Sequence, residues 1–302
     1  MPIDIVYLVT NGLSKFNVEE FQKMNHCLVF GARGHLAQTR IIPALEKMRC
    51  PYTPISRQHV ADLEHLRDVK NVVAYMSIPT HNFCENVEPY LGLVDATYIL
   101  EKPHGHSKYD FERIKDFIDE NNLKVVYNDH YLGKDILRHI QTPKKLESIK
   151  IKLHETGDID SRINYFDTVG IVGDMYQSHC VLLFATVLAK YTGKTRKEIL
   201  KELRSVTPEF THIARHVNYG GVAPTECKMS MTYDGVTLEA DMAKMVPEDK
   251  YILVNDNDKW KLDYGGCAYE NVLKQIKCKN KNFFLEEEEV DYLWDHASII
   301  SC

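Results

Sequence analysis

The stretch that decides the fold is HCLVFGARGHLAQTRIIPAL, residues 26–45. Its apolar run 27–30 predicts a buried strand that leads directly into Gly31 and Gly34, and a helical pattern follows. Glycine at a strand exit lets backbone N–H groups approach a pyrophosphate, and the start of a helix adds a positive partial charge. The spacing GxxG fits a plain tight turn equally well, so this stretch alone leaves both interpretations open.

The region around this stretch alternates short β-rich runs with longer amphipathic runs. Residues 108–121 place Phe111, Ile114, Phe117 and Ile118 on one helical face. Alternation of this kind predicts a parallel sheet with helices on both faces. We therefore expect an α/β fold whose first domain, residues 1–144, is Rossmann-like and binds a dinucleotide. The predicted strands are 27–30, 52–56, 72–77, 96–100 and 124–128.

The second half of the chain has a different pattern. Residues 149–153 alternate like a half-exposed strand, 181–191 form a strongly apolar helix, and 227–263 read as an antiparallel meander. A late helix is predicted at 268–277, and the acidic run 286–289 is interpreted as a solvated segment. A smaller α+β domain with a largely antiparallel sheet is expected over residues 145–302.

Composition narrows the class of protein. The net charge of −6 and the dispersed charged residues argue against a nucleic-acid partner. No apolar run approaches the length of a membrane span, and the N-terminus lacks the basic start of a signal peptide. The eight cysteines show no CxxC spacing, so neither a zinc site nor a disulfide framework is predicted. We expect a cytoplasmic protein without a resident metal.

The end of the second predicted strand bears on cofactor choice. NAD-specific folds of this class carry an acid there for the ribose, whereas this chain has Ser56, Arg57 and Gln58. An arginine suits a 2′-phosphate, because it forms charge-assisted hydrogen bonds with phosphate oxygens. NADP is therefore favoured over NAD, and a solvated loop arginine is the alternative interpretation.

Residues 165–179, YFDTVGIVGDMYQSH, hold a carboxylate and an imidazole five positions apart. A metal-free alcohol dehydrogenase needs a group with a pKa near neutrality to take the hydroxyl proton, and a carboxylate to hold that group in one tautomer. We therefore predict that His179 is a general base and that Asp174 orients it. The alternative is a helix histidine with its hydrogen bonds satisfied and an acid that caps the helix.

Two polar segments follow predicted strands at the sheet edge where parallel sheets bind ligands. Lys102 and Pro103 come after strand 96–100, and Lys102 is predicted to donate to a substrate hydroxyl or to the reacting oxygen. His130, Tyr131 and Lys134 come after strand 124–128 and offer a suitable set for a phosphate monoester. Ordinary turn chemistry would account for either segment taken alone.

These segments, in this order, resemble those of the glucose-6-phosphate dehydrogenase family. The resemblance covers residues 26–190 and fades after about Tyr191, and the run DHYLGK is its most specific part. The family's fingerprint segments are GASGDLA, YLALPP, EKPFG, DHYLGK and YFDEFGIIRDVMQNH. Here they appear as GARGHLA (31–37), YMSIPT (75–80), EKPHG (101–105), DHYLGK (129–134) and YFDTVGIVGDMYQSH (165–179).

The resemblance implies an enzyme of carbohydrate metabolism that oxidises C1 of a hexose phosphate to a lactone and passes hydride to NADP. It implies His179 as the base with Asp174 as its partner, Lys102 in contact with substrate and reacting centre, and Glu155 on the sugar hydroxyls. It also implies a phosphate site and a cofactor site. The phosphate residues are His130, Tyr131 and Lys134, and the cofactor residues are Gly31, Gly34, Leu36, Arg40, Arg57, Pro79 and Pro103.

The chain also departs from the family pattern. Arg33 and His35 replace a serine and an acid of the glycine loop, and Gly173 stands where an arginine is expected before Asp174. The region after His179 is much shorter than in full-length members, and Lys228 is the nearest counterpart of the family's sugar-pocket lysine. A homodimer is the expected assembly, although a shortened sheet offers less apolar surface for pairing subunits.

Two further interpretations follow from these departures. One is a divergent dehydrogenase that acts on another phosphosugar or on a nucleotide sugar in a specialised biosynthetic pathway. The other is a non-catalytic homologue that binds NADP. The presence of both Asp174 and His179 favours an enzyme.

Overall fold

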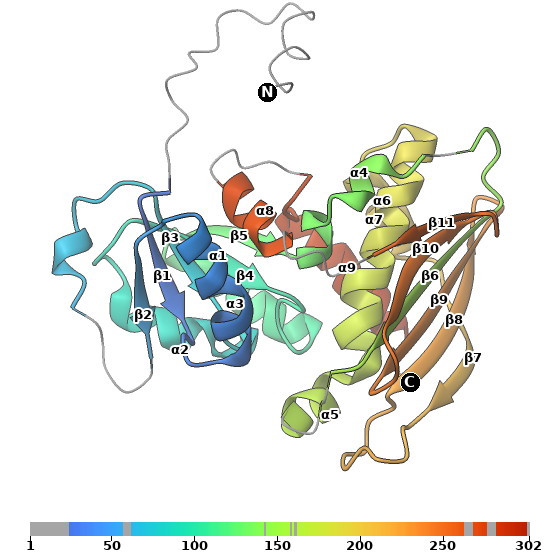
Figure 1. The fold of residues 1–302 in the computed structure, drawn as a ribbon, viewed down its shortest axis with the longest axis horizontal. Coiled ribbons are helices and arrows are strands. Elements are labelled where there is room, and N and C mark those ends of the chain that lie inside the picture. Colours follow the sequence, from blue (N-terminus) through green and yellow to red (C-terminus); the bar gives the residue numbers. More distant parts are fainter. Residues whose placement is uncertain are drawn as a thin grey trace, which may run out of the picture.

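The computed structural model describes residues 24–300 apart from 57–61, 142, 158, 160–161, 263–267 and 277–281. Its two sheets lie at opposite sides of the molecule, and several helices lie between them (Figure 1). The architecture confirms the expected fold class, a parallel α/β sheet followed by a mostly antiparallel sheet. The predicted domain boundary at residue 144 stays a prediction.

The first sheet is parallel throughout and has the strand order β2-β1-β3-β4-β5. Alternate residues of one strand enter different cores, as the two-residue period of a strand requires. In β1, Leu28 and Phe30 join one hydrophobic cluster, whereas Cys27 and Val29 join the other. The strands are β1 (His26–Phe30), β2 (Tyr52–Ile55), β3 (Val72–Met76), β4 (Ala96–Glu101) and β5 (Lys124–Asn128).

Helices connect these strands, as the alternating pattern predicted. The longest is α3 (Lys108–Glu120), in which the side chain of Ser107 caps the N-terminus and Phe111, Ile114 and Ile118 face the core. The shorter segments are η3 (Ala37–Ile41), α1 (Ile42–Lys47), η4 (Glu64–Leu66), η5 (Thr80–Asn82), α2 (Phe83–Val87), η6 (Glu88–Tyr90), η7 (His130–Gly133) and α4 (Ile136–His139).

The second sheet has the order β11-β10-β6-β9-β8-β7, and every neighbouring pair is antiparallel except β6 and β9. Ile149, Ile151 and Leu153 of β6 are fully buried, which confirms the alternation expected there. The strands are β6 (Ser148–Glu155), β7 (Glu209–Ala214), β8 (Glu226–Tyr233), β9 (Val236–Lys244), β10 (Asp249–Val254) and β11 (Asp258–Lys261).

A long helical run crosses the space between the sheets (Figure 1). It comprises α5 (Ile163–Ile171), the π-helix η9 (Val172–Cys180) and α6 (Val181–Thr192), with a kink at Gly170, whose φ is 64°. The run is long and apolar enough to cross a membrane, but 89% of its most apolar window is buried inside the protein. It therefore packs as a core helix, and the shorter α7 (Arg196–Leu203) follows it.

The C-terminal helices return to the first sheet. Helix α8 (Ala268–Gln275) contributes Val272 and Leu273 to the cluster on one face of that sheet. Helix α9 (Glu287–Ile300) follows, and within the acidic run 286–289 Glu288 is exposed, so the interpretation as a solvated segment is wrong only for Glu289. Glu289 is only 2% exposed and forms a bidentate ion pair with Arg196, which compensates for its burial.

Candidate active site

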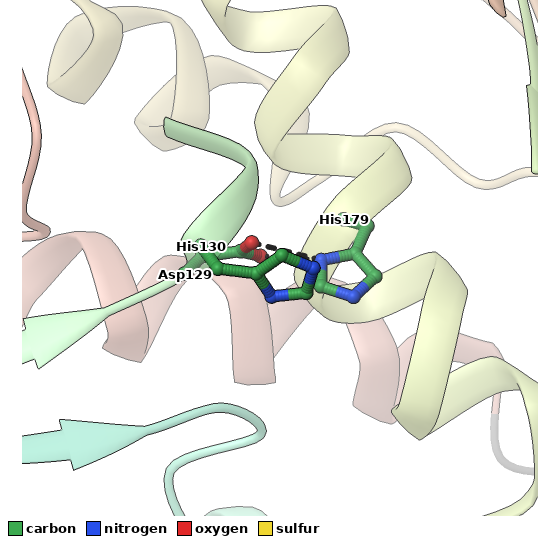
Figure 2. A group of neighbouring side chains, drawn as sticks. All are labelled: Asp129, His130 and His179. Carbon is green, nitrogen blue, oxygen red and sulfur yellow. Dashed lines mark hydrogen bonds and ion pairs between the residues drawn. The ribbon is translucent and has the colours of Figure 1, made fainter. Parts of the chain in front are cut away.

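The centre of the candidate site lies where β5 ends. Asp129 directly follows this strand and caps η7, because its Oδ1 accepts a hydrogen bond from the backbone N–H of Tyr131 at 2.9 Å. The same carboxylate accepts a hydrogen bond from Nδ1 of His179, at 2.9 Å to Oδ1 and 2.7 Å to Oδ2 (Figure 2). His179 reaches this point from the π-helix η9. The contact joins residues that are 50 positions apart in the sequence.

Burial sets the charge state of this pair, since Asp129 is 1% and His179 2% exposed. Burial lowers the pKa of His179 below its usual 6.5, and the Asp129 carboxylate opposes that shift. Burial would raise the pKa of Asp129, but the charge and hydrogen bond of His179 hold it well below the usual range. The pair is therefore a neutral imidazole beside an ionised carboxylate at neutral pH, an arrangement that leaves the Nε2 lone pair of His179 available as a base.

The predicted contact between Asp174 and His179 is wrong. The carboxylate of Asp174 instead binds Nζ of Lys102 at 2.8 Å and Nζ of Lys244 at 2.7 Å. Two ammonium groups stabilise a buried carboxylate better than one neutral imidazole does, and Asp129 already occupies the Nδ1 side of His179. Burial would raise the pKa of Asp174, but Lys102 and Lys244 hold it well below its usual range.

The two ion pairs of Asp174 belong to a buried chain of alternating charges. Lys244 also binds Glu155 at 2.6 Å, and Lys250 binds the other oxygen of Glu155 at 2.9 Å. Glu155 and Lys244 are register partners on the parallel pair β6 and β9, which brings their side chains together. Burial would raise the pKa of Glu155, but the two lysines hold it well below its usual range.

Lys244 and Lys250 are site residues that the sequence prediction missed. Lys228 was expected to be the sugar-pocket lysine, but its side chain is 54% exposed and lies 3.6 Å from the carboxylate of Asp241. Lys244 and Lys250 stand at the ends of β9 and β10, where a lysine on an otherwise apolar strand face was the available signal. The missed role of Asp129 had a similar signal, a carboxylate directly after a buried strand.

The three predicted phosphate residues lie together. The rings of His130 and Tyr131 are 4.8 Å apart, and Nζ of Lys134 lies 5.0 Å from the Tyr131 ring. Nζ of Lys134 also donates to the carbonyl of Leu262 at 3.2 Å, and Tyr269 of α8 stacks on His130 at 5.2 Å. A cavity of about 150 Å³ adjoins His130 and Lys134, and its wall includes Arg40, Lys47 and Thr39.

The predicted cofactor residues are placed at the edge formed by β1 and β3. Gly31 has a φ of +70°, and a Cβ there would lie 2.5 Å from the carbonyl oxygen of Ser77, so only glycine fits this crossing. Gly34 closes the turn through a 2.7 Å hydrogen bond to Gly31, and Leu36 starts the π-helix that carries Arg40. In this strand order β2 lies on one side of β1 and β3 on the other, and the switch point between β1 and β3 is where sheets of this class bind nucleotides.

The remaining predicted cofactor residues are Pro79 and Pro103, in the loops after β3 and β4, and Arg57. Pro79 precedes η5, and Pro103 follows the cis peptide bond of Lys102. Their two loops are joined by the backbone N–H of Gly105, which donates to Oγ1 of Thr80 at 2.9 Å. Arg57, on which the preference for NADP depends, lies outside the described residues.

Glu101 adds a further buried carboxyl next to Lys102. Glu101 ends β4 directly before Lys102, and it accepts hydrogen bonds from the hydroxyl of Tyr75 and from Nδ2 of Asn128. The backbone carbonyl of Asn128 in turn accepts the N–H of Lys102 at 3.1 Å. Burial raises the pKa of Glu101 to about 7.

Comparison with known proteins points to one family. Residues 132–222 match the model of the glucose-6-phosphate dehydrogenase C-terminal domain. The glucose-6-phosphate 1-dehydrogenase of Chlamydia pneumoniae is 32% identical over 130 residues, which are 36% of this chain and 25% of that protein. The Helicobacter pylori (strain J99) protein of the same name is 26% identical over 198 residues, 56% of this chain and 46% of that protein. The matches thus span less than half the length of these curated relatives.

Solved structures share the fold over most of the chain. Glucose-6-phosphate 1-dehydrogenase from Mycobacterium avium superposes with a TM-score of 0.66 at 15% identity, covering 90% of this chain and 91% of that one. A glucose-6-phosphate dehydrogenase in complex with glucose-6-phosphate gives 0.63 at 14% identity, covering 93% and 92%. The WlbA dehydrogenase from Thermus thermophilus, solved with NAD and α-ketoglutarate, gives 0.56 at 15% identity, covering 92% and 95%. At these identities the likeness establishes the fold alone.

Proposed function

We propose that this chain is a cytoplasmic NADP-dependent dehydrogenase, which oxidises C1 of a hexose phosphate to a lactone. The proposal starts from its membership, as a shortened and divergent chain, of the glucose-6-phosphate dehydrogenase family. The observation that carries the proposal is the buried pair of Asp129 and His179, which lies beside Lys102 and Asp174. A base oriented by a carboxylate is what metal-free oxidation of a hydroxyl group requires.

In the proposed reaction His179 takes the proton of the C1 hydroxyl. Its Nδ1–H donates to Asp129, so the lone pair on Nε2 is the one that accepts the proton. Asp129 then stabilises the imidazolium that forms. General-base catalysis of this kind contributes about 10²- to 10⁴-fold to the rate.

Lys102 and Glu155 are assigned to the reacting end of the sugar. Lys102 carries positive charge next to the proposed site of proton removal, where it stabilises the oxygen as negative charge develops. Asp174 holds the ammonium of Lys102 in place at 2.8 Å. Glu155, whose two oxygens bind Lys244 and Lys250, is assigned to the sugar hydroxyls. His130, Tyr131 and Lys134 are assigned to the phosphate, beside the cavity of about 150 Å³.

The glycine turn after β1 fits a dinucleotide. Gly31 packs directly against Ser77, so the loops after β1 and β3 meet at the point where sheets of this order bind nucleotides. Gly31, Gly34, Leu36 and Arg40 would hold the phosphates, and Arg57 would select the 2′-phosphate of NADP. Pro79 and Pro103 would shape the nicotinamide pocket. The nicotinamide, when bound, supplies the acceptor for the hydride.

The direct test is absorbance at 340 nm with purified protein, NADP and glucose 6-phosphate. Parallel reactions contain NAD, unphosphorylated glucose and other hexose phosphates. Turnover that needs the phosphate, that is faster with NADP than with NAD, and that His179→Asn lowers at least 100-fold is the expected result. Turnover that persists in His179→Asn contradicts the assignment of the base.

A second candidate function is oxidation of a different phosphosugar or of a nucleotide sugar. The observation that favours it is the packing of α8 on the phosphate segment, where Tyr269 covers His130 and Lys134 is tied to Leu262. If Lys134→Ala leaves the KM for glucose 6-phosphate unchanged while another sugar substrate is oxidised faster, this candidate replaces the first.

A further inference from the structure

The Asp129 and His179 pair has a third potential ligand beside it. One ligand atom each of Asp129, His130 and His179 lie within 4.8 Å of one another. The two imidazoles approach edge to face at 5.1 Å, and Figure 2 shows the His130 ring next to that of His179, which is joined to the carboxylate by a hydrogen bond. Within the described part of the chain this is the group of three side chains whose types and spacing suit a metal ion.

The ligand atoms that these three side chains offer suit a divalent transition metal. Imidazole nitrogen and carboxylate oxygen are the ligands that zinc and cobalt accept, and a histidine must be neutral to coordinate. Nδ1 of His179 faces both oxygens of the Asp129 carboxylate, so these two ligands already converge on one point. Nδ1 of His130 is buried and has no hydrogen-bond partner among the described residues.

The distances are close to those of a coordination site. Ligand atoms that surround zinc tetrahedrally at about 2.0–2.1 Å lie roughly 3.3 Å apart. Nδ1 of His179 and the Asp129 oxygens are already 2.7–2.9 Å apart, so only His130 has to close in, by about 1.5 Å at most from its limit of 4.8 Å.

Neighbouring groups hold two of the three ligands, and a cavity lies beside His130. The N–H of Tyr131 holds the Asp129 carboxylate, and Tyr269 stacks on the His130 ring. Of the three ligands, His130 lines the cavity of about 150 Å³ that Lys134 also borders.

Nearby charges determine how tightly an ion is held. The ammonium groups of Lys102 and Lys134 lie close enough to His130 to repel a metal cation bound there. The positive charge of Lys102 is balanced by the carboxylate of Asp174 at 2.8 Å, which reduces this repulsion. The balance favours an exchangeable ion over a permanent structural metal.

We propose that Asp129, His130 and His179 form an inhibitory site for a divalent transition metal such as Zn²⁺, which binds reversibly and locks His179 in the wrong tautomer. The metal takes the lone pair of Nδ1, so the proton carried there moves through solvent to Nε2. The neutral imidazole keeps its single proton, and no net proton is released. A protonated Nε2 cannot accept the proton of a substrate hydroxyl.

Cobalt binding to the full-length protein tests the site without any activity measurement, because Co²⁺ in a tetrahedral site with nitrogen and oxygen ligands has strong visible absorption bands. One equivalent should produce these bands, and Zn²⁺ should abolish them. His130→Gln and His179→Gln should each weaken Co²⁺ binding at least tenfold. Circular dichroism checks that each variant is folded, and His130→Gln alone decides the result if His179→Gln does not fold.

The matched control is the other close pair of histidines, His81 and His106, whose ring centres are 4.0 Å apart. The double variant H81Q/H106Q should bind Co²⁺ within twofold of the wild type. Loss of the bands in this variant, or binding that survives in His130→Gln, overturns the proposal.

A second measurement concerns inhibition and rests on the proposed function. Zn²⁺ should inhibit NADPH formation, chelation by EDTA should restore it, and the phosphorylated sugar should compete with the ion because both use His130. If no sugar is oxidised the proposed function fails, whereas the cobalt spectrum still decides whether the metal site exists. Inhibition of equal strength at all sugar concentrations, with the cobalt bands unaffected by sugar, contradicts binding at His130.

Discussion

The replacement of Asp129 by asparagine tests the orientation of His179 with little change in shape. The asparagine Oδ1 can still accept the N–H of Tyr131, which lies 2.9 Å from the native oxygen. Its amide group then faces Nδ1 of His179 and donates to it. Nδ1 must therefore become an acceptor, and the ring proton moves to Nε2, where it blocks the base.

The size of the effect follows from the interactions that are changed. Restoring the active tautomer places two donors face to face in a buried site and loses a charge-assisted hydrogen bond of about 1.5–3 kcal/mol. The clash of buried donors adds about 1–3 kcal/mol. Together, roughly 3–6 kcal/mol corresponds to a loss of about 10²- to 10⁴-fold in kcat. Cofactor binding should be unchanged, since the glycine turn after β1 is not altered.

The assay is NADPH formation under saturating substrate, with NADPH affinity measured separately by fluorescence. The matched control is Asp241→Asn, which changes the partner of His154 in another aspartate and histidine contact of 2.9 Å, on the face of β6 opposite to Glu155. This control should keep kcat within twofold. A kcat for Asp129→Asn above a third of the wild-type value would refute the reasoning, because Asp129 would then not set the tautomer.

Three further predictions concern pH and stability. Burial lowers the pKa of His179 below 6.5, so log kcat/KM should stay level as pH falls to 6.5 and should decline with a slope of one only below that value; a decline that begins above pH 7 contradicts a neutral base. Burial raises the pKa of Glu101 to about 7, so the folded state retains a proton that the unfolded chain releases near pH 4.3, and stability is lost as pH rises through 7. Urea titrations should show that Glu101→Gln gains roughly 3 kcal/mol relative to the wild type between pH 4 and pH 8; a pH-independent difference rules this out. Arg196→Met should lower the free energy of unfolding by about 3–5 kcal/mol because it leaves Glu289 buried without a cation, whereas Lys194→Ala, at an exposed ion pair, should lower it by less than about 1 kcal/mol; equal effects would contradict this difference.

The fold was largely readable from local patterns. The five parallel strands appear within one or two residues of the predicted runs, because each is a short apolar segment bounded by turn residues. The strand β7 was not predicted, since its exposed residues show no alternation of apolar and polar side chains. The buried position of Glu289 was also missed, because its partner Arg196 is 93 positions away and only packing of α7 on α9 brings them together.

The candidate site was readable in its residue types but not in its pairs. Lys102, His130 and His179 stand in motifs that the sequence displays, and the structure places them around one centre. The assignment of Asp174 to His179 is wrong because residues five positions apart in a π-helix need not touch, and each side chain has another partner within reach. Lys244 was missed because no local motif marks a lysine that becomes buried only when β9 pairs with β6.

The sequence by itself determined the order of strands and helices, the glycine turn after the first strand and the family resemblance, because each of these depends on residues close together in the chain. The tertiary structure alone decided which carboxylate serves which base. Asp129 meets His179 across 50 residues, and Asp174 is left to Lys102 and Lys244. Such contacts depend on where a strand end, a π-helix and a second sheet come to lie in space, and a buried charge takes whichever partner that arrangement places within reach.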